Sequence, residues 1–188
     1  MIKIYTDGGA RPNPGFGGFG VYSEILQLNY FESLSNVTNN QMELAAVIFA
    51  YDYAEKHNLK EKIIIYTDSN YVVQGVNSWK VKWKKENWKN VKNKELWILL
   101  DDYETKNKHI SLEWIKGHNG ELGNEIADCL ATQGVESKSN NTIIDFISSV
   151  ELNRRGFSED LDKIQKKQND IFVIENTIED LLKDLTIF

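Results

Sequence analysis

Four acidic residues lie in apolar surroundings, where an unpaired carboxylate is costly to bury. Asp7 and Asp68 each end a short apolar segment, whereas Glu43 and Asp128 interrupt apolar stretches of predicted helix. Singly, each has an ordinary interpretation, because an aspartate after a strand is typically a turn residue and an acid on a helix is typically solvated or paired. Together they favour a bound hard divalent cation, since carboxylates with open water positions suit Mg²⁺ and a phosphate substrate.

The elements that would position these acids form a mixed sheet with helices packed on it. We predict three antiparallel strands and then two parallel strands, at about residues 2–6, 19–25, 28–34, 62–67 and 110–115. Predicted helices lie at about residues 39–57, 69–76, 94–106 and 122–132, and Asn39 or Asn40 is the predicted cap of the first helix.

The string Ile-Tyr-Thr-Asp occurs twice, ending once at Asp7 and once at Asp68. Ligands of sheets that contain parallel strands bind beyond the carboxyl ends of the strands. If the two strands are neighbours, the two aspartates therefore converge at one edge of the sheet.

Four groups of residues, which follow one another in order, resemble the sequence motifs of type 1 ribonuclease H over residues 1 to about 134. They are Thr6-Asp7-Gly8-Gly9 with Asn13-Pro14-Gly15 and Gly17-Gly18; Thr38 to Leu44; Tyr66-Thr67-Asp68-Ser69 with Tyr71-Val72; and Trp114-Ile115-Lys116-Gly117-His118 with Gly120, Asn124-Glu125 and Ala127-Asp128. The resemblance implies a ribonuclease H-like α/β fold and an endonuclease that hydrolyses the RNA strand of RNA–DNA hybrids.

The resemblance also implies a metal-dependent active site. The family's four metal-binding carboxylates fall on Asp7, Glu43, Asp68 and Asp128, and its mobile catalytic histidine falls on His118. Two Mg²⁺ ions about 4 Å apart would act on the bound substrate, with Mn²⁺ as a possible substitute. The implied products carry a 5′-phosphate and a 3′-hydroxyl.

Small and polar residues near the predicted metal site suit a strand that displays 2′-hydroxyls, because contacts to these hydroxyls distinguish RNA from DNA. The residues in question are Gly8, Gly9, Asn13, Gln41, Ser69 and Asn70. By resemblance, Asn13 and Thr38 hold a DNA phosphate. Asn40, Asn70 and Gln74 then lie along the minor groove of the hybrid, although the family often has glutamine at the position of Asn70.

A basic segment follows the fourth predicted strand, with seven lysines and one acid between Lys80 and Lys94. Lysines interleaved with tryptophans indicate backbone binding, and the segment resembles the family's basic protrusion. Its predicted substrate contacts are Trp83, Lys84, Lys85, Trp88 and Lys89. The alternative is an amphipathic helix with solvated lysines and buried tryptophans, which we favour for Trp79 and Trp97.

Composition places few limits on function. The net charge of −6 argues mildly against a nucleic-acid partner, but the lysine segment shows that charge is unevenly distributed. The sequence contains no stretch of about 18 apolar residues, the length that would indicate a membrane-spanning helix. Cys129 is the lone cysteine, which excludes an internal disulfide and fits the reducing cytoplasm.

The predicted catalytic domain covers residues 1–135, and residues 136–188 form a C-terminal extension with a structural or protein-interaction role. Residues 136–141 are a predicted linker, and predicted helices begin near Ser158 and near Asn176. Their apolar stripes need a partner. Packing on the catalytic domain is favoured, with self-association or a protein partner as alternatives.

Two rival functions remain open. The same fold supports transposases, integrases and other nucleases, so the fold alone does not choose among them. A non-catalytic module that binds hybrids is the second rival, but converging carboxylates would weaken its hold on phosphates. Metal-dependent cleavage of a hybrid, measured beside matched RNA and DNA duplexes, separates these possibilities.

Overall fold

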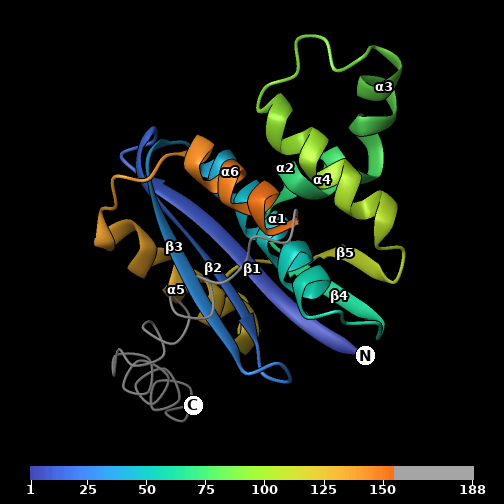
Figure 1. The fold of residues 1–188 in the computed structure, drawn as a ribbon. Helices are drawn as coiled ribbons and strands as arrows, with labels where there is room; N and C mark the ends of the chain where they lie inside the picture. The colour runs from blue at the N-terminus through green and yellow to red at the C-terminus, as the bar shows by residue number, and fades with distance from the viewer. Residues whose placement is uncertain (155–188) are drawn as a thin grey trace. The chain divides into compact units, whose positions relative to one another are not determined.

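The computed structural model describes residues 1–154, which are built around a five-stranded sheet (Figure 1). Strands β1 (Ile2–Arg11), β2 (Gly15–Ser23) and β3 (Leu28–Val37) are antiparallel, and β4 (Ile63–Thr67) and β5 (Ile110–Trp114) continue the sheet parallel to β1. The order across the sheet is β3-β2-β1-β4-β5. The predicted mixed sheet is therefore confirmed.

The register between β1 and β4 aligns the two copies of Ile-Tyr-Thr-Asp. The three residues before Asp7 pair one by one with the three residues before Asp68, ending with Thr6 opposite Thr67. Asp7 and Asp68 consequently lie side by side where the pairing of β1 with β4 ends. Strand β1 is longer than predicted and continues along β2 as far as Arg11.

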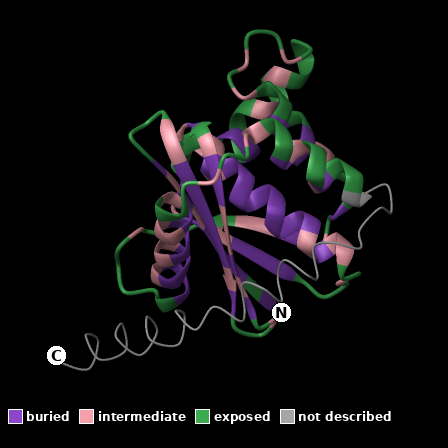
Figure 2. Ribbon diagram, turned by 60° about the vertical axis from the view of Figure 1, so that its left-hand side comes forward, coloured by how far each residue is buried: buried purple, intermediate pink, exposed green. Residues whose placement is uncertain are grey.

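Helices cover both faces of the sheet. Helix α1 (Asn39–Lys56) packs on one face against β1 and β2, and α5 (Leu122–Ser137) packs on the other against β1, β2 and β3 (Figure 1). Helix α4 (Lys94–Lys106) packs against α1. Helix α1 is buried along most of its length, as the apolar centre of this helix predicts (Figure 2).

The first turn of α1 is fixed by a residue other than the predicted cap. Thr38, in an extended conformation, is the N-cap in place of Asn39 or Asn40. Its hydroxyl accepts a hydrogen bond from the Gln41 N–H at 3.4 Å, and the Gln41 side chain accepts one from the Thr38 N–H at 2.8 Å. This reciprocal capping box satisfies two backbone donors and fixes the first turn of α1, which directly precedes Glu43.

Between β4 and α4 the helical path is longer than predicted. It comprises α2 (Asn70–Gln74), the π-helical segment η1 (Gly75–Trp79) and α3 (Lys80–Lys85). Gly75 lies directly against the indole of Trp97 on α4, and any side chain at this position would collide with that ring. The lysine segment thus begins on a helix that is held close to α4.

Helix α6 (Ile143–Arg154) is an element that the sequence prediction lacks. It packs against α1 and β3, and its Phe146 and Val150 belong to the main core, each only 2% exposed. A sequence signal was present, because apolar residues recur at helical spacing and Thr142 caps the helix together with Asp145.

The predicted boundary after residue 135 falls inside a compact unit that runs from Met1 to Gly156. Glu136 and Ser137 complete α5. The rest of the predicted linker lies along β3, where the Asn141 carbonyl accepts a hydrogen bond from the Ser35 N–H at 2.7 Å. The helices predicted near Ser158 and Asn176 lie outside the described residues. Within residues 1–154, no helix is both long and apolar enough to span a bilayer.

Candidate active site

Three of the predicted carboxylates converge at the carboxyl edge of the parallel strands. Asp7 extends from β1, Asp68 follows β4, and Glu43 is the fifth residue of α1. One oxygen from each lies within 4.8 Å of the others. Gly8 makes this convergence possible, because any side chain there would collide with the backbone of α1 at Met42 and Glu43.

The fourth predicted carboxylate, Asp128, approaches this group from α5 on the other face of the sheet. Burial, followed by the charges of Asp68 and Asp128, raises the pKa of Asp7 to about 7. Burial, followed by the charges of Asp7 and Asp68, also raises the pKa of Glu43. The four residues thus form a compact acidic centre whose charges are mutually unfavourable without a cation.

The chemistry of this centre fits a hard divalent metal ion. Within residues 1–154, no group donates a hydrogen bond to the buried Oε2 of Glu43. A buried carboxylate oxygen without a donor is costly, and a cation held with Asp7 and Asp68 would satisfy it. Oxygen donors from three carboxylates are the ligands that Mg²⁺ and Mn²⁺ prefer.

Two residues on neighbouring elements hold Asp68. The indole Nε1 of Trp114, at the end of β5, donates to the Asp68 carbonyl at 3.1 Å, although the Trp114 side chain is 47% exposed. The buried Asn124 amide of α5 lies 3.5 Å from Asp68 Oδ2. Gly117 packs against the same carboxylate, where a side chain would collide with it.

These supporting residues had no assigned role in the sequence. Trp114, Gly117 and Asn124 stand in motifs that resemble the family, and their place there was the available signal. Their contacts with Asp68 depend on how β5 and α5 pack, which spacing along the chain does not predict.

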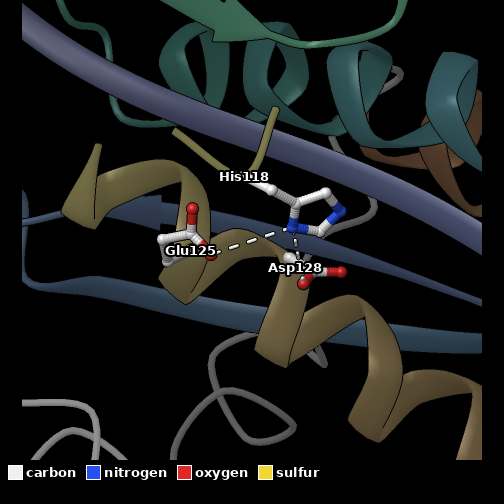
Figure 3. A group of neighbouring side chains, drawn as sticks. All are labelled: His118, Glu125 and Asp128. Atoms are coloured by element: carbon white, nitrogen blue, oxygen red, sulfur yellow. Dashed lines mark ion pairs between the residues drawn. The ribbon is translucent and has the colours of Figure 1, made fainter. Parts of the chain in front are cut away.

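His118 lies beside the fourth carboxylate, on the loop between β5 and α5. Its Nδ1 is 3.9 Å from Glu125 Oε2 and 4.0 Å from Asp128 Oδ2 (Figure 3). The histidine side chain is 76% exposed, and its φ of 50° is unusual for a residue other than glycine. Glu125 is a neighbour of His118 that its place in the sequence does not predict.

A sequence model of the RNase H family matches residues 1–136. The chain belongs to this family. A Ribonuclease H of Orientia tsutsugamushi is 46% identical over 141 residues, which cover 71% of the chain and 81% of that protein. Ribonuclease HI of Haemophilus influenzae strain KW20 is 42% identical over 150 residues, which cover 73% of the chain and 91% of that protein.

Solved structures of other proteins contain a similar fold. LC9-RNase H1, a type 1 RNase H with the type 2 active-site motif, has a TM-score of 0.61 and 27% identity, and the match covers 73% of each chain. A foamy viral protease–reverse transcriptase in complex with an RNA/DNA hybrid has a TM-score of 0.61 and 25% identity over 72% of this chain and 20% of that one. Membership of the RNase H family gives the chain ribonuclease H activity and a general dependence on divalent metal.

Near the start of α1, several predicted substrate residues have structural duties. Asn13 Oδ1 accepts a hydrogen bond from the Asn39 N–H at 3.2 Å, so the β1–β2 turn is joined to α1. Thr38 and Gln41 cap α1 with their side chains. Asn40 is exposed and available to a ligand.

The predicted substrate contacts that follow β4 also divide into a residue with a structural role and residues that are exposed. Ser69 is buried, caps α2 and accepts from the Val72 N–H at 3.5 Å. Asn70 and Gln74 are exposed on the same short helix. Gly9, on β1, has nothing within 4 Å of the position that a side chain would occupy, so its small size is not explained by packing.

The tryptophans of the basic segment form one cluster. Trp83 contacts Trp79, Trp88 and Trp97, with ring centroids 5.1–6.2 Å apart. Trp97 is 1% exposed, as expected of a core residue, whereas Trp79 is 40% exposed, so the prediction that it is buried was wrong. The cause is the π-helical segment η1, which ends at Trp79 and leaves it on the rim of the cluster.

The lysines of the segment are not equivalent. Lys84 forms an ion pair with Asp101 of α4 at 2.7 Å, and Lys80 forms one with Glu104 at 2.7 Å. Lys85 and Lys89 are exposed. Among the predicted lysine contacts, Lys84 is therefore partly neutralised before any substrate binds.

Proposed function

We propose that the chain is a magnesium-dependent endonuclease that hydrolyses the RNA strand of RNA–DNA hybrids, with Asp7, Glu43, Asp68 and Asp128 as metal ligands. The observation that carries the proposal is the convergence of three carboxylates around a buried Glu43 oxygen that lacks a hydrogen bond among the described residues. Mn²⁺ is the expected substitute, because it accepts the same oxygen donors.

When bound, two Mg²⁺ ions would activate a water molecule and stabilise the leaving 3′ oxygen. The carboxylates hold the ions and do not become covalently modified. The bond that breaks joins phosphorus to the 3′ oxygen, so the products carry a 5′-phosphate and a 3′-hydroxyl. Trp114 and Asn124 orient Asp68 through the contacts described above.

His118 moves protons or assists departure of the product in this proposal. Its exposed ring stands 4.0 Å from Asp128, on a loop bounded by Gly117 and Gly120. Gly120 has a φ of 77°, a conformation that favours glycine. A histidine is suited to this role because its ordinary pKa lies near neutrality.

Recognition of the hybrid is divided between two surfaces in our proposal. Five residues border the RNA strand near the metal site: Gly8, Gly9, Gln41, Ser69 and Asn70. Where a side chain already bonds within the protein, the residue contacts the RNA through its backbone groups. The DNA strand is held by Asn13 and Thr38 through a phosphate, by Asn40, Asn70 and Gln74 in the minor groove, and by the segment with Trp83, Lys84, Lys85, Trp88 and Lys89. The foamy viral relative with a bound RNA/DNA hybrid supports this substrate.

We further propose that residues 1–135 carry the catalytic chemistry and that residues 136–188 form an appendage with a structural or protein-interaction role. The packing of α6 on α1 and β3 supports a structural role for the first part of this appendage. The proposed compartment is the cytoplasm, which suits a chain with one cysteine.

The deciding experiment compares an RNA–DNA hybrid with an RNA duplex, a DNA duplex and single-stranded RNA of the same sequence. We expect cleavage of the hybrid's RNA strand alone, in Mg²⁺ or Mn²⁺, with loss of cleavage in EDTA. End-group analysis should give 5′-phosphate and 3′-hydroxyl. Tight hybrid binding without cleavage would favour the binding module, and cleavage of the DNA duplex would favour another nuclease of this fold.

A further inference from the structure

A pocket of about 220 Å³ opens beside the carboxylates, between the end of β1 and helix α5. Asp7 and Asp128 line it near the acidic centre, and Arg11 and Val135 line it farther along β1 and α5. We call it the β1–α5 pocket. None of the roles proposed above uses its far end.

Two walls of the pocket run in the same direction, away from the metal site. Successive side chains of a strand point to opposite faces, so Asp7, Gly9 and Arg11 share the face of β1 that is covered by α5. On α5, the lining residues Asp128, Ala131, Thr132 and Val135 recur at helical spacing along one flank. Asp7 and Arg11 are separated by four strand residues, or about 13 Å at about 3.3 Å per residue.

The middle of the pocket is open. Gly9 has nothing within 4 Å of the position that a side chain would occupy, and the small residues Ala131 and Thr132 line the α5 wall between Asp128 and Val135. Between the carboxylates and Arg11, the pocket is therefore bordered on β1 by a residue without a side chain.

Arg11 provides a positive charge at the far end. Its side chain is exposed, and it has no ion-pair partner within residues 1–154. It therefore differs from Lys80 and Lys84, whose charges are paired within the protein. A guanidinium presents a planar fork of donors that matches the geometry of a phosphate.

We infer that Arg11 binds a backbone phosphate of the RNA strand, a few nucleotides from the phosphate that is cleaved, and thereby sets how firmly that strand is seated. The RNA strand is the ligand because the pocket begins at the carboxylates, where the RNA is cut. The inference rests on the proposed function and adds a substrate-binding residue to it. The Thr132 hydroxyl, on the opposite wall, is placed to support the same strand.

The first test is steady-state cleavage of a short hybrid by Arg11→Ala and Arg11→Lys. Lys60→Ala, which removes an exposed charge in the turn between α1 and β4, is the matched control. For Arg11→Ala we expect KM to rise about tenfold, equivalent to about 1.4 kcal/mol, with kcat within about twofold. The slope of log KM against log salt should fall by about one unit, as for the loss of one phosphate contact. Arg11→Lys should recover most of the affinity, and Lys60→Ala should resemble wild type.

The second test locates the phosphate with hybrids that carry one uncharged methylphosphonate linkage, moved step by step along each strand. In the wild-type protein, a methylphosphonate at one RNA linkage near the cut should raise KM about as much as Arg11→Ala does. The Arg11→Ala protein should show no further rise in KM with the hybrid that carries this linkage. A sensitive linkage found solely on the DNA strand would overturn the inference, as would an Arg11→Ala protein with unchanged KM and salt slope. If the wild-type protein fails to cut the unmodified hybrid, the proposed function itself fails, which is a different result.

Discussion

The carboxyl group of Asp7 keeps its proton to a higher pH in the folded, metal-free protein than in an unfolded chain. Burial first, and then the charges of Asp68 and Asp128, raise its pKa from 3.8 to about 7. A group whose folded pKa is raised in this way binds more protons when folded, so stability falls as pH rises between the two values. The metal-free protein should therefore lose stability between about pH 4 and about pH 7.

Asp7→Asn tests this electrostatic cost and the metal site together. The substitution removes a buried charge, so in EDTA at pH 8 the variant should melt a few degrees higher than wild type, and the difference should shrink at pH 4. Without this ligand, hybrid cleavage in Mg²⁺ should fall by more than about 100-fold. Thermal melts and cleavage assays give both readouts, with Asp102→Asn on the exposed side of α4 as control. Cleavage at the wild-type rate would remove Asp7 from the site.

Trp114 allows a finer test, because its ring is half exposed while its indole nitrogen is bonded to the Asp68 carbonyl. Trp114→Phe keeps an aromatic ring and removes that hydrogen bond. We expect kcat to fall about tenfold and the Mg²⁺ concentration for half-maximal rate to rise, at the lower end of the about 10- to 100-fold effects of residues that orient metal ligands. KM for the hybrid should stay the same.

Trp79→Phe is the matched control for Trp114→Phe. Trp79 is exposed to a similar extent, and its indole nitrogen has no hydrogen bond within residues 1–154. An equal effect of both substitutions on the Mg²⁺ requirement would show that Trp114 does not position Asp68.

At the scale of elements, α3 and α4 act as one unit because two lysines of α3 are paired with acids of α4. These pairs reduce the charge that α3 presents and hold the tryptophan cluster against α4. Lysines that follow α3, such as Lys89, lack such partners in the described structure and project from the loop between α3 and α4. We therefore expect some lysines of this segment to attach α3 to α4 and others to attract the substrate.

Paired substitutions separate these two roles. Lys85→Ala with Lys89→Ala should raise KM for the hybrid several-fold and lower the salt slope by about one to two units, since each lost phosphate contact removes about one unit. Lys80→Ala with Lys84→Ala should change KM less and lower the stability of the protein, because Asp101 and Glu104 lose their partners. Equal effects of the two pairs on KM and its salt dependence would show that the ion pairs to α4 do not distinguish the lysines.

Element by element, prediction from sequence succeeded where a long apolar pattern fixes the period. The strands and the buried α1 belong to this group. It failed where a tertiary contact decides the outcome, as at η1, where the close approach of Gly75 to Trp97 sets the helical path. The acidic residues were predicted by type, but the Trp114 and Asn124 contacts with Asp68 depend on the packing of separate elements.

On the scale of the whole described region, the core is closed by a helix that lies beyond the family match. That match ends at residue 136, whereas Phe146 and Val150 of α6 are buried among core residues of α1 and the sheet. Phe146 meets Phe19 of β2 at 5.6 Å between ring centroids. The four carboxylates therefore lie in a unit whose core includes residues of α6, and we expect α6 to contribute to its stability.

Phe146→Ala should lower the free energy of unfolding by about 3–5 kcal/mol, the usual cost of removing a buried phenylalanine. Ile144→Ala, on the same helix but 70% exposed, is the control and should change it by less than about 0.5 kcal/mol. Urea titration measures both. A chain ending at Glu136 should be destabilised at least as much as Phe146→Ala, but where it folds its kcat should stay within about tenfold, a barrier change of about 1.4 kcal/mol. Equal stability of chains ending at Glu136 and at Gly156 would contradict a core role for α6.

The matched register of β1 and β4 has a consequence for which sequence changes the site can tolerate. The positions of Asp7 and Asp68 depend on a count of residues along two adjacent strands. One inserted or deleted residue ahead of either aspartate would shift it by about 3.3 Å and turn it to the opposite face of the sheet. Insertions should therefore be accepted in the β2–β3 turn, near Glu24, while a single added residue inside either Ile-Tyr-Thr-Asp string should eliminate metal binding, even though every ligand would still be present in the chain.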